Sequence, residues 1–134
     1  MTIGEVAERA GLRASAIRFY EKAGLLPRAV RAGGQRRYDG KILERLALVE
    51  FAKECGFTLA EIRQLFHGYR DNTPLSARMQ LLAARKVQEL DALAGRIGIM
   101  KNMLARAQRC RCIDVDECGR RILAAAQKVS SDAN

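Results

Sequence analysis

The chain has 134 residues, of which 49% are hydrophobic and 29% charged, enough for one or two small folded units. Its 24 lysines and arginines exceed its 15 aspartates and glutamates, and the net charge of +9 favours a polyanionic partner, first of all nucleic acid. No apolar run is long enough to cross a bilayer and no signal-peptide pattern is present, so we expect a cytoplasmic protein without a membrane partner.

Two short helices are predicted at the start of the chain. Apolar residues recur at helical spacing over residues 3–10, and Thr2 with Glu5 forms a capping-box pattern. After a break at Gly11, a second helix is predicted over residues 15–23. Two short helices joined by a tight turn that contains glycine are typical of a helix-turn-helix, whose second helix lies in the major groove of DNA.

A β-hairpin is predicted over residues 28–38. Gly33 and Gly34 supply its turn, and two short extended arms flank them. The hairpin has no acidic residue and contains four arginines, which are Arg28, Arg31, Arg36 and Arg37. A solvated hairpin needs no such bias, so we interpret it as a wing that contacts the phosphate backbone of DNA.

Two more helices are predicted after the wing, over residues 42–55 and 59–66. The second begins with another capping-box pattern, formed by Thr58 and Glu61. A polar linker over residues 69–74 follows, and its composition separates the N-terminal part of the chain from what comes next.

A long helix is predicted over residues 75–107, about 50 Å at 1.5 Å per residue. Its seam positions step by alternating four and three residues, which is a heptad pattern. They are Met79, Ala83, Lys86, Leu90, Leu93, Ile97, Met100 and Leu104. The chain has no second long helix to cover this seam, so we expect the same helix of a second copy to pack against it, parallel or antiparallel.

A loop with three cysteines is predicted over residues 108–119, followed by a short helix over residues 120–129. Cys110, Cys112 and Cys118 fall within nine residues of sequence. Structural disulfides are not expected in the cytoplasm, so three close thiols indicate a soft-metal or redox site. Thiolates select Cu(I), Zn(II), Hg(II) and iron–sulfur clusters.

Four strings of the sequence together resemble the MerR family of transcriptional regulators. They are TIGEVA at residues 2–7, AIRFYEKAGLL at 16–26, GQRRY at 34–38 and CGFTLAEI at 55–62. The resemblance implies a mainly α fold with a winged helix-turn-helix, a long antiparallel coiled-coil dimerisation helix and a C-terminal effector site. It also implies that a dimer binds a promoter palindrome and distorts it when the effector binds, so that RNA polymerase can engage.

The same pattern assigns DNA contacts. Arg18, on the second helix, is placed to reach a base edge, and Arg13, Ser15 and Tyr20 can hold phosphates. The wing is expected to clamp the backbone through Arg31, Gln35, Arg36, Arg37 and Tyr38. We expect Phe19 to be buried.

The cysteine loop leaves the effector open. Cys110 and Cys118, with seven residues between them, resemble the ligand pair of copper-type sensors, and Ser76 replaces the further cysteine usual in sensors of divalent ions. The Cys-x-Cys-x5-Cys spacing and the wing also resemble the SoxR-type redox sensor, which holds a [2Fe–2S] cluster. Its first cysteine would fall at Ala107, however, and such a cluster needs four ligands. A soft metal ion of the Cu(I), Zn(II) or Hg(II) class is therefore our leading prediction, with a cluster or a metal-free thiol sensor as alternatives.

The predicted organisation is a DNA-binding domain over residues 1–70, a dimerisation helix over 75–107 and an effector region over 108–134. An architectural DNA-binding protein would not need the cysteine loop, and a metal-storage protein would not need the basic wing. We do not expect an enzyme, because the sequence has no Ser–His–Asp set, no paired carboxylates, no phosphate-cradling glycine loop and one histidine.

Overall fold

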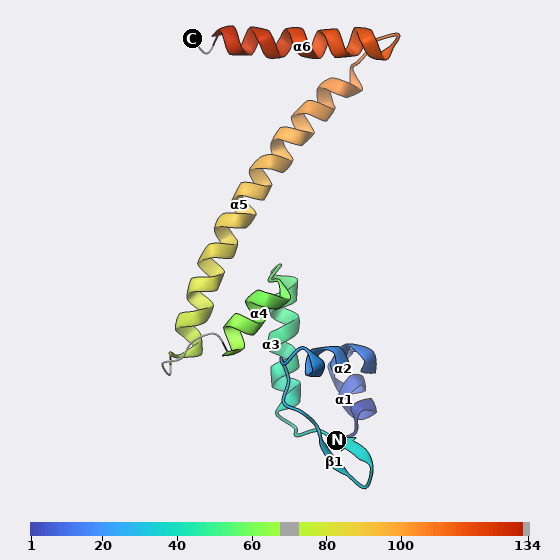
Figure 1. Cartoon of the computed structure of the whole chain (residues 1–134), viewed down its shortest axis with the longest axis vertical. Helices are drawn as coiled ribbons and strands as arrows, with labels where there is room; N and C mark the ends of the chain where they lie inside the picture. The colour runs from blue at the N-terminus through green and yellow to red at the C-terminus, as the bar shows by residue number, and fades with distance from the viewer. Residues whose placement is uncertain (68–72, 133–134) are drawn as a thin grey trace. The chain divides into compact units, whose positions relative to one another are not determined.

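The computed structural model describes residues 1–67 and 73–132, and confirms a mainly helical fold with one small hairpin (Figure 1). The elements are α1 (Ile3–Ala10), α2 (Ala14–Lys22), β1 (Val30–Ala32), β2 (Gln35–Arg37), α3 (Ile42–Glu54), α4 (Leu59–His67), α5 (Leu75–Gln108) and α6 (Val115–Asp132). They form two compact units, Met1–Leu90 and Asp91–Asn134. The predicted linker falls mostly outside the described residues.

The turns of the N-terminal unit follow from local chemistry. The backbone N–H of Glu5 donates to Thr2 Oγ1 at 3.2 Å, which caps the start of α1. The wing pairs β1 with β2 in antiparallel register, with Arg31 opposite Arg36. Gly33 and Gly34 have φ values of 60° and 80°, and a two-residue hairpin turn of this type needs positive φ at both positions.

The core of this unit draws apolar side chains from every helix from α1 to α5. Its fully buried residues include Val6, Ile17, Leu46, Ile62 and Leu82. In the same unit, α1 packs against both α2 and α3 (Figure 1). The second helix and the wing are therefore held on a packed helical base.

The prediction that Phe19 is buried is wrong, because 55% of its surface is exposed. The buried residues of α2 are Ile17 and Tyr20, three positions apart. Successive helical residues turn by about 100°, so Phe19 points away from the face that these two residues share. Its ring packs edge-on against Tyr20 at a centroid distance of 5.8 Å.

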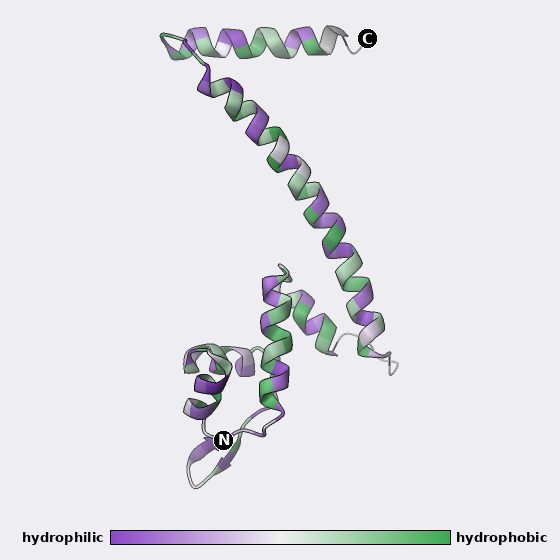
Figure 2. Cartoon of the chain, turned by 180° about the vertical axis from the view of Figure 1, so that it is seen from behind, coloured by the Kyte–Doolittle hydropathy of each residue, from purple (hydrophilic) through white to green (hydrophobic). Residues whose placement is uncertain are grey.

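The helix α5 has 34 residues, as the heptad pattern predicted to within one residue. Its first turns belong to the N-terminal unit, where Leu82 and Lys86 are buried. Beyond them the seam is exposed, by between 44% and 64%, at Leu90, Leu93, Ile97, Met100 and Leu104. Apolar residues alternate with hydrophilic ones along α5 and α6 (Figure 2). Among the described residues, no helix combines the length and apolar character needed to span a membrane.

The prediction of a cysteine loop reaching residue 119 is wrong, because α6 begins at Val115 rather than at Arg120. The N–H of Glu117 donates to Asp114 Oδ1 at 2.8 Å, and the N–H of Ile113 donates to Glu117 Oε2 at 3.1 Å. Side-chain caps of this kind satisfy the free N–H groups of a first turn. Cys118 therefore lies on the helix and not in the loop.

Candidate DNA-binding surface and cysteine site

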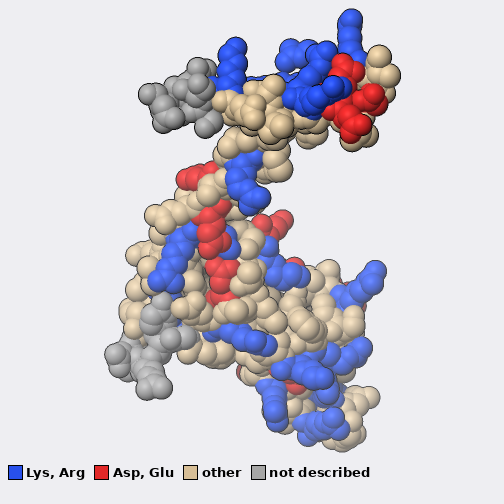
Figure 3. Space-filling view, turned by 45° about the horizontal axis from the view of Figure 1, so that its top comes forward, with Lys and Arg blue, Asp and Glu red and all other residues tan. Residues whose placement is uncertain are grey.

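Lys and Arg side chains gather at the end of the N-terminal unit that carries the wing (Figure 3). Arg13, Ser15 and Arg18 are exposed on or just before α2. Arg18 lines a cleft of about 350 Å³ together with Gln35 and Arg36 of the wing. Arg31 and Arg37 are exposed on the two strands. The second helix and the wing thus present one continuous basic surface.

The structure gives both tyrosines of the predicted DNA-contact set partners inside the protein. Tyr20 is 4% exposed, its hydroxyl donates to Glu50 Oε1 at 2.9 Å, and it accepts from Lys53 Nζ at 2.6 Å. Tyr38 is 5% exposed, and its hydroxyl donates to Glu21 Oε2 at 2.8 Å. Burial raises the pKa of both phenols. Both hydroxyls are bound inside the protein, so the two residues support the surface, and the DNA contacts predicted for them stay a prediction.

Glu21 joins the wing to α2, a role that the sequence reasoning missed. Its side chain is 12% exposed. Besides Tyr38, it accepts the backbone N–H of Ala29 at 3.0 Å, and it lies 3.6 Å from the guanidinium of Arg36. The sequence does mark this role, because Glu21 is the single acid between Arg13 and Arg37 and is surrounded by basic residues.

Side chains of α4 hold the end of α2. Arg63 Nε donates to the carbonyl of Ala23 at 2.9 Å, and His67 Nε2 lies 2.8 Å from the carbonyl oxygen of Gly24. The last carbonyls of a helix lack partners within the helix, and basic side chains satisfy them. The single histidine is therefore accounted for as a helix-end residue.

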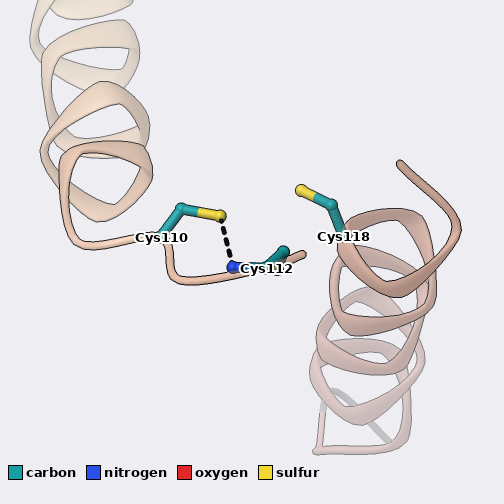
Figure 4. Close-up of side chains that lie close together, drawn as sticks. All are labelled: Cys110, Cys112 and Cys118. Atoms are coloured by element: carbon teal, nitrogen blue, oxygen red, sulfur yellow. Dashed lines mark hydrogen bonds between the residues drawn. The ribbon is translucent and has the colours of Figure 1, made fainter. Parts of the chain in front are cut away.

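The three predicted cysteines of the C-terminal unit come together. Their sulfur atoms all lie within 4.8 Å of one another. Cys110 follows the end of α5, Cys118 lies in the first turn of α6, and their side chains point toward each other across the loop (Figure 4). Zinc–thiolate bonds of about 2.3 Å would place three sulfurs around one ion roughly 4 Å apart. The thiols are therefore spaced to share one soft ion.

The loop backbone prepares one of the thiols for this chemistry. The N–H of Cys112 donates to Cys110 Sγ at 3.5 Å, and this bond lowers the pKa of Cys110. The side-chain hydrogen bond with Cys110 raises the pKa of Cys112 to about 11. The loop backbone therefore favours the thiolate of Cys110, and thiolates are the form of cysteine that binds metal.

The chain matches the model of the MerR HTH family regulatory proteins over residues 1–69, and the model described as MerR, DNA binding, over residues 43–107. The chain belongs to the MerR family. The HTH-type transcriptional regulator CueR of Salmonella typhi is 34% identical over 120 residues, which cover 88% of this chain and 87% of the relative.

Two solved structures place the fold within the MerR family. PbrR691 from Ralstonia metallidurans CH34, determined in complex with lead(II), is 28% identical with a TM-score of 0.72, over 87% of this chain and 92% of that one. HiNmlR, a MerR family regulator bound to promoter DNA, is 28% identical with a TM-score of 0.53, over 84% of this chain and 93% of that one. The chain is thus a transcriptional regulator of the MerR type and not an enzyme, as the sequence predicted.

Proposed function

We propose that this MerR regulator responds to a soft metal ion held by Cys110, Cys112 and Cys118, and that it switches transcription by distorting promoter DNA. The observation that carries the proposal is the set of three thiols within 4.8 Å, in a chain whose other unit has the DNA-binding fold of the family. PbrR691, which shares the fold, was solved with lead(II). In this proposal residues 1–70 bind DNA, residues 75–107 form the dimerisation helix, and residues 108–134 form the effector region.

On DNA, α2 lies in the major groove and the wing lies along the backbone. Arg18 reaches a base edge, and Arg13 and Ser15 hold phosphates. The remaining backbone contacts come from Arg31, Gln35, Arg36 and Arg37. Support comes from the exposure of these arginines, except the half-buried Arg36, and from the cleft that Arg18 shares with the wing.

The partner for α5 is a second copy of the chain, packed antiparallel as in a coiled coil. Support comes from the apolar seam between Leu90 and Leu104, which is about half exposed in the single chain. A two-fold dimer requires a palindromic operator. The distortion lets RNA polymerase engage the same promoter. We place this regulator in the cytoplasm.

The three thiolates suit an ion of the Cu(I), Zn(II) or Hg(II) class, which soft sulfur ligands prefer. A [2Fe–2S] cluster does not fit, because it needs four protein ligands and Ala107 stands where the fourth cysteine would be. A metal-free thiol sensor is the second candidate. The lowered pKa of Cys110 favours it, because thiolates are also the form that oxidants attack.

Footprinting on promoter DNA tests the proposal, using anaerobically purified protein with and without Cu(I), Zn(II) or Hg(II). We expect a protected palindrome in both forms, and enhanced chemical reactivity at its centre with one of the ions. Cys110→Ser and Cys118→Ser should abolish the enhancement, whereas Cys55→Ser, the matched control outside the loop, should keep it. Absence of a protected palindrome refutes the DNA role. A response to peroxide but to no ion establishes the thiol sensor instead.

A further inference from the structure

Lys86 is the one charged residue found buried within the described part of the chain, with 8% of its surface exposed. Heptad spacing places it on the seam one step before Leu90, where an apolar residue is expected. Leu90 is 46% exposed, but the side chain of Lys86 is enclosed by the N-terminal unit. An ionic group at such a position needs a reason beyond hydrophobic packing.

The ammonium of Lys86 is held by two helices. Its Nζ donates to Glu61 Oε1 of α4 at 2.9 Å and to Glu89 Oε2 of α5 at 2.8 Å. It also lies 5.7 Å from the ring centroid of Phe57, in the turn between α3 and α4. The same Glu61 oxygen accepts the backbone N–H of Thr58 at 2.9 Å, which caps α4. One carboxylate oxygen therefore ties α5 to the first turn of α4.

This ionic contact does more to orient α5 against α4 than to stabilise the fold. Buried ion pairs are often replaced by apolar residues at no cost in folding free energy, and Leu82, one turn earlier, already packs α5 with 2% exposure. Sliding α5 by one residue would move its side chains by about 1.5 Å and rotate them by about 100°. Hydrogen bonds near 2.9 Å do not survive such a shift. Lys86 therefore fixes how α5 is rotated about its own axis, and where it lies along that axis, relative to α4.

We propose that Lys86 is a positioning residue that couples the cysteine site to the DNA-binding surface. The inference rests on the proposed function. The helix α5 runs without interruption from Lys86 to Gln108, two residues before Cys110. A turn or shift of α5 caused at the loop is passed to α4 only while the Lys86–Glu61 contact holds. Arg63 and His67 of α4 in turn bind the end of α2, so the contact reaches the helix that enters the major groove.

The test compares Lys86→Met with Lys101→Met, a matched change at an exposed position of the same helix. The affinity of the full-length protein for Cu(I), Zn(II) or Hg(II), whichever the wild type responds to, is measured with and without operator DNA. In the wild type we expect the ratio of these affinities to lie in the range of about 5–150 typical of coupled sites. Lys86→Met should bring it to within about twofold of one, with operator affinity of the metal-free form within about threefold of wild type. Lys101→Met should keep the wild-type ratio.

The outcomes separate coupling from mere support of the fold. A Lys86→Met protein that keeps the wild-type ratio overturns the inference, whether or not it also loses thermal stability and metal-free operator binding. Should Lys86→Met not fold, Glu61→Gln removes the charged partner of Lys86 on α4 and should lower the ratio; an unchanged ratio then overturns the inference. If operator DNA does not change the affinity of the wild-type protein for any of the ions, the proposed function fails. If the wild type and Lys86→Met show the same ratio above one, only the inference about Lys86 fails.

Discussion

Replacing Glu21 by leucine should loosen the wing and destabilise the N-terminal unit. The carboxylate accepts two short hydrogen bonds, from the N–H of Ala29 at 3.0 Å and from the hydroxyl of Tyr38 at 2.8 Å. Hydrogen bonds to charged groups contribute about 1.5–3 kcal/mol each, and Tyr38 is too buried for water to replace its partner. The ion pair with Arg36, at 3.6 Å and with the arginine 39% exposed, adds less than about 1 kcal/mol.

We therefore expect Glu21→Leu to lower the free energy of unfolding by about 3–5 kcal/mol, a large part of the 5–15 kcal/mol typical of a folded domain. Glu21→Gln keeps the shape but not the charge and should cost about 1–2 kcal/mol. Tyr38→Phe, which removes one partner only, is the control. Urea denaturation followed by circular dichroism measures all three variants. A loss below about 0.5 kcal/mol in Glu21→Leu would refute this account of how the wing is held.

Three further predictions concern the operator, the seam and pH. Arg37→Ala should weaken binding about equally across operator sequences and reduce the slope of log affinity against log salt by about one, as measured by titration at several salt concentrations. Ile97→Asp should shift the protein to monomer in analytical ultracentrifugation, and Gln88→Asp, on the opposite face of α5, should leave the dimer intact. The N–H of Thr58 and the ammonium of Lys86 lower the pKa of Glu61, so its stabilisation is present above the ordinary glutamate pKa and is lost as pH falls through the lowered value. Melting temperatures should therefore fall less between pH 6 and pH 3 in Glu61→Gln than in the wild type; an equal fall would contradict the assignment.

The helices were predictable because their ends are marked by local chemistry. Thr58 and Glu61 form both bonds of the capping box read from the sequence, and paired glycines of positive φ make the hairpin turn. Asp114 and Glu117 form the same kind of cap and mark the start of α6. The three cysteines nearby favour a loop in the sequence analysis, and that prediction hides the cap. Local signals of this kind act over three or four residues and need no knowledge of the fold.

The roles of the aromatic residues could not be predicted in this way. Two adjacent residues, Phe19 and Tyr20, both suit a helix, and the choice of which one is buried depends on where α3 places Glu50 and Lys53. Lys86 was assigned to the dimer seam by spacing alone, and only the partner Glu61, 25 residues earlier in the chain, shows that it faces inward. Contacts between distant segments decided each of these cases.

The N-terminal unit takes up the first part of the α5 seam, and this limits what is left for a second copy. From Leu90 to Leu104 the helix rises by about 21 Å, roughly two heptads, which is shorter than the three or four that usually sustain a coiled coil. A dimer held by this stretch alone would dissociate at low concentration. Occupancy of a palindromic operator would then rise with the square of the chain's abundance. A twofold change in the level at which a cell produces this regulator would thereby change the occupancy of its promoter by about fourfold.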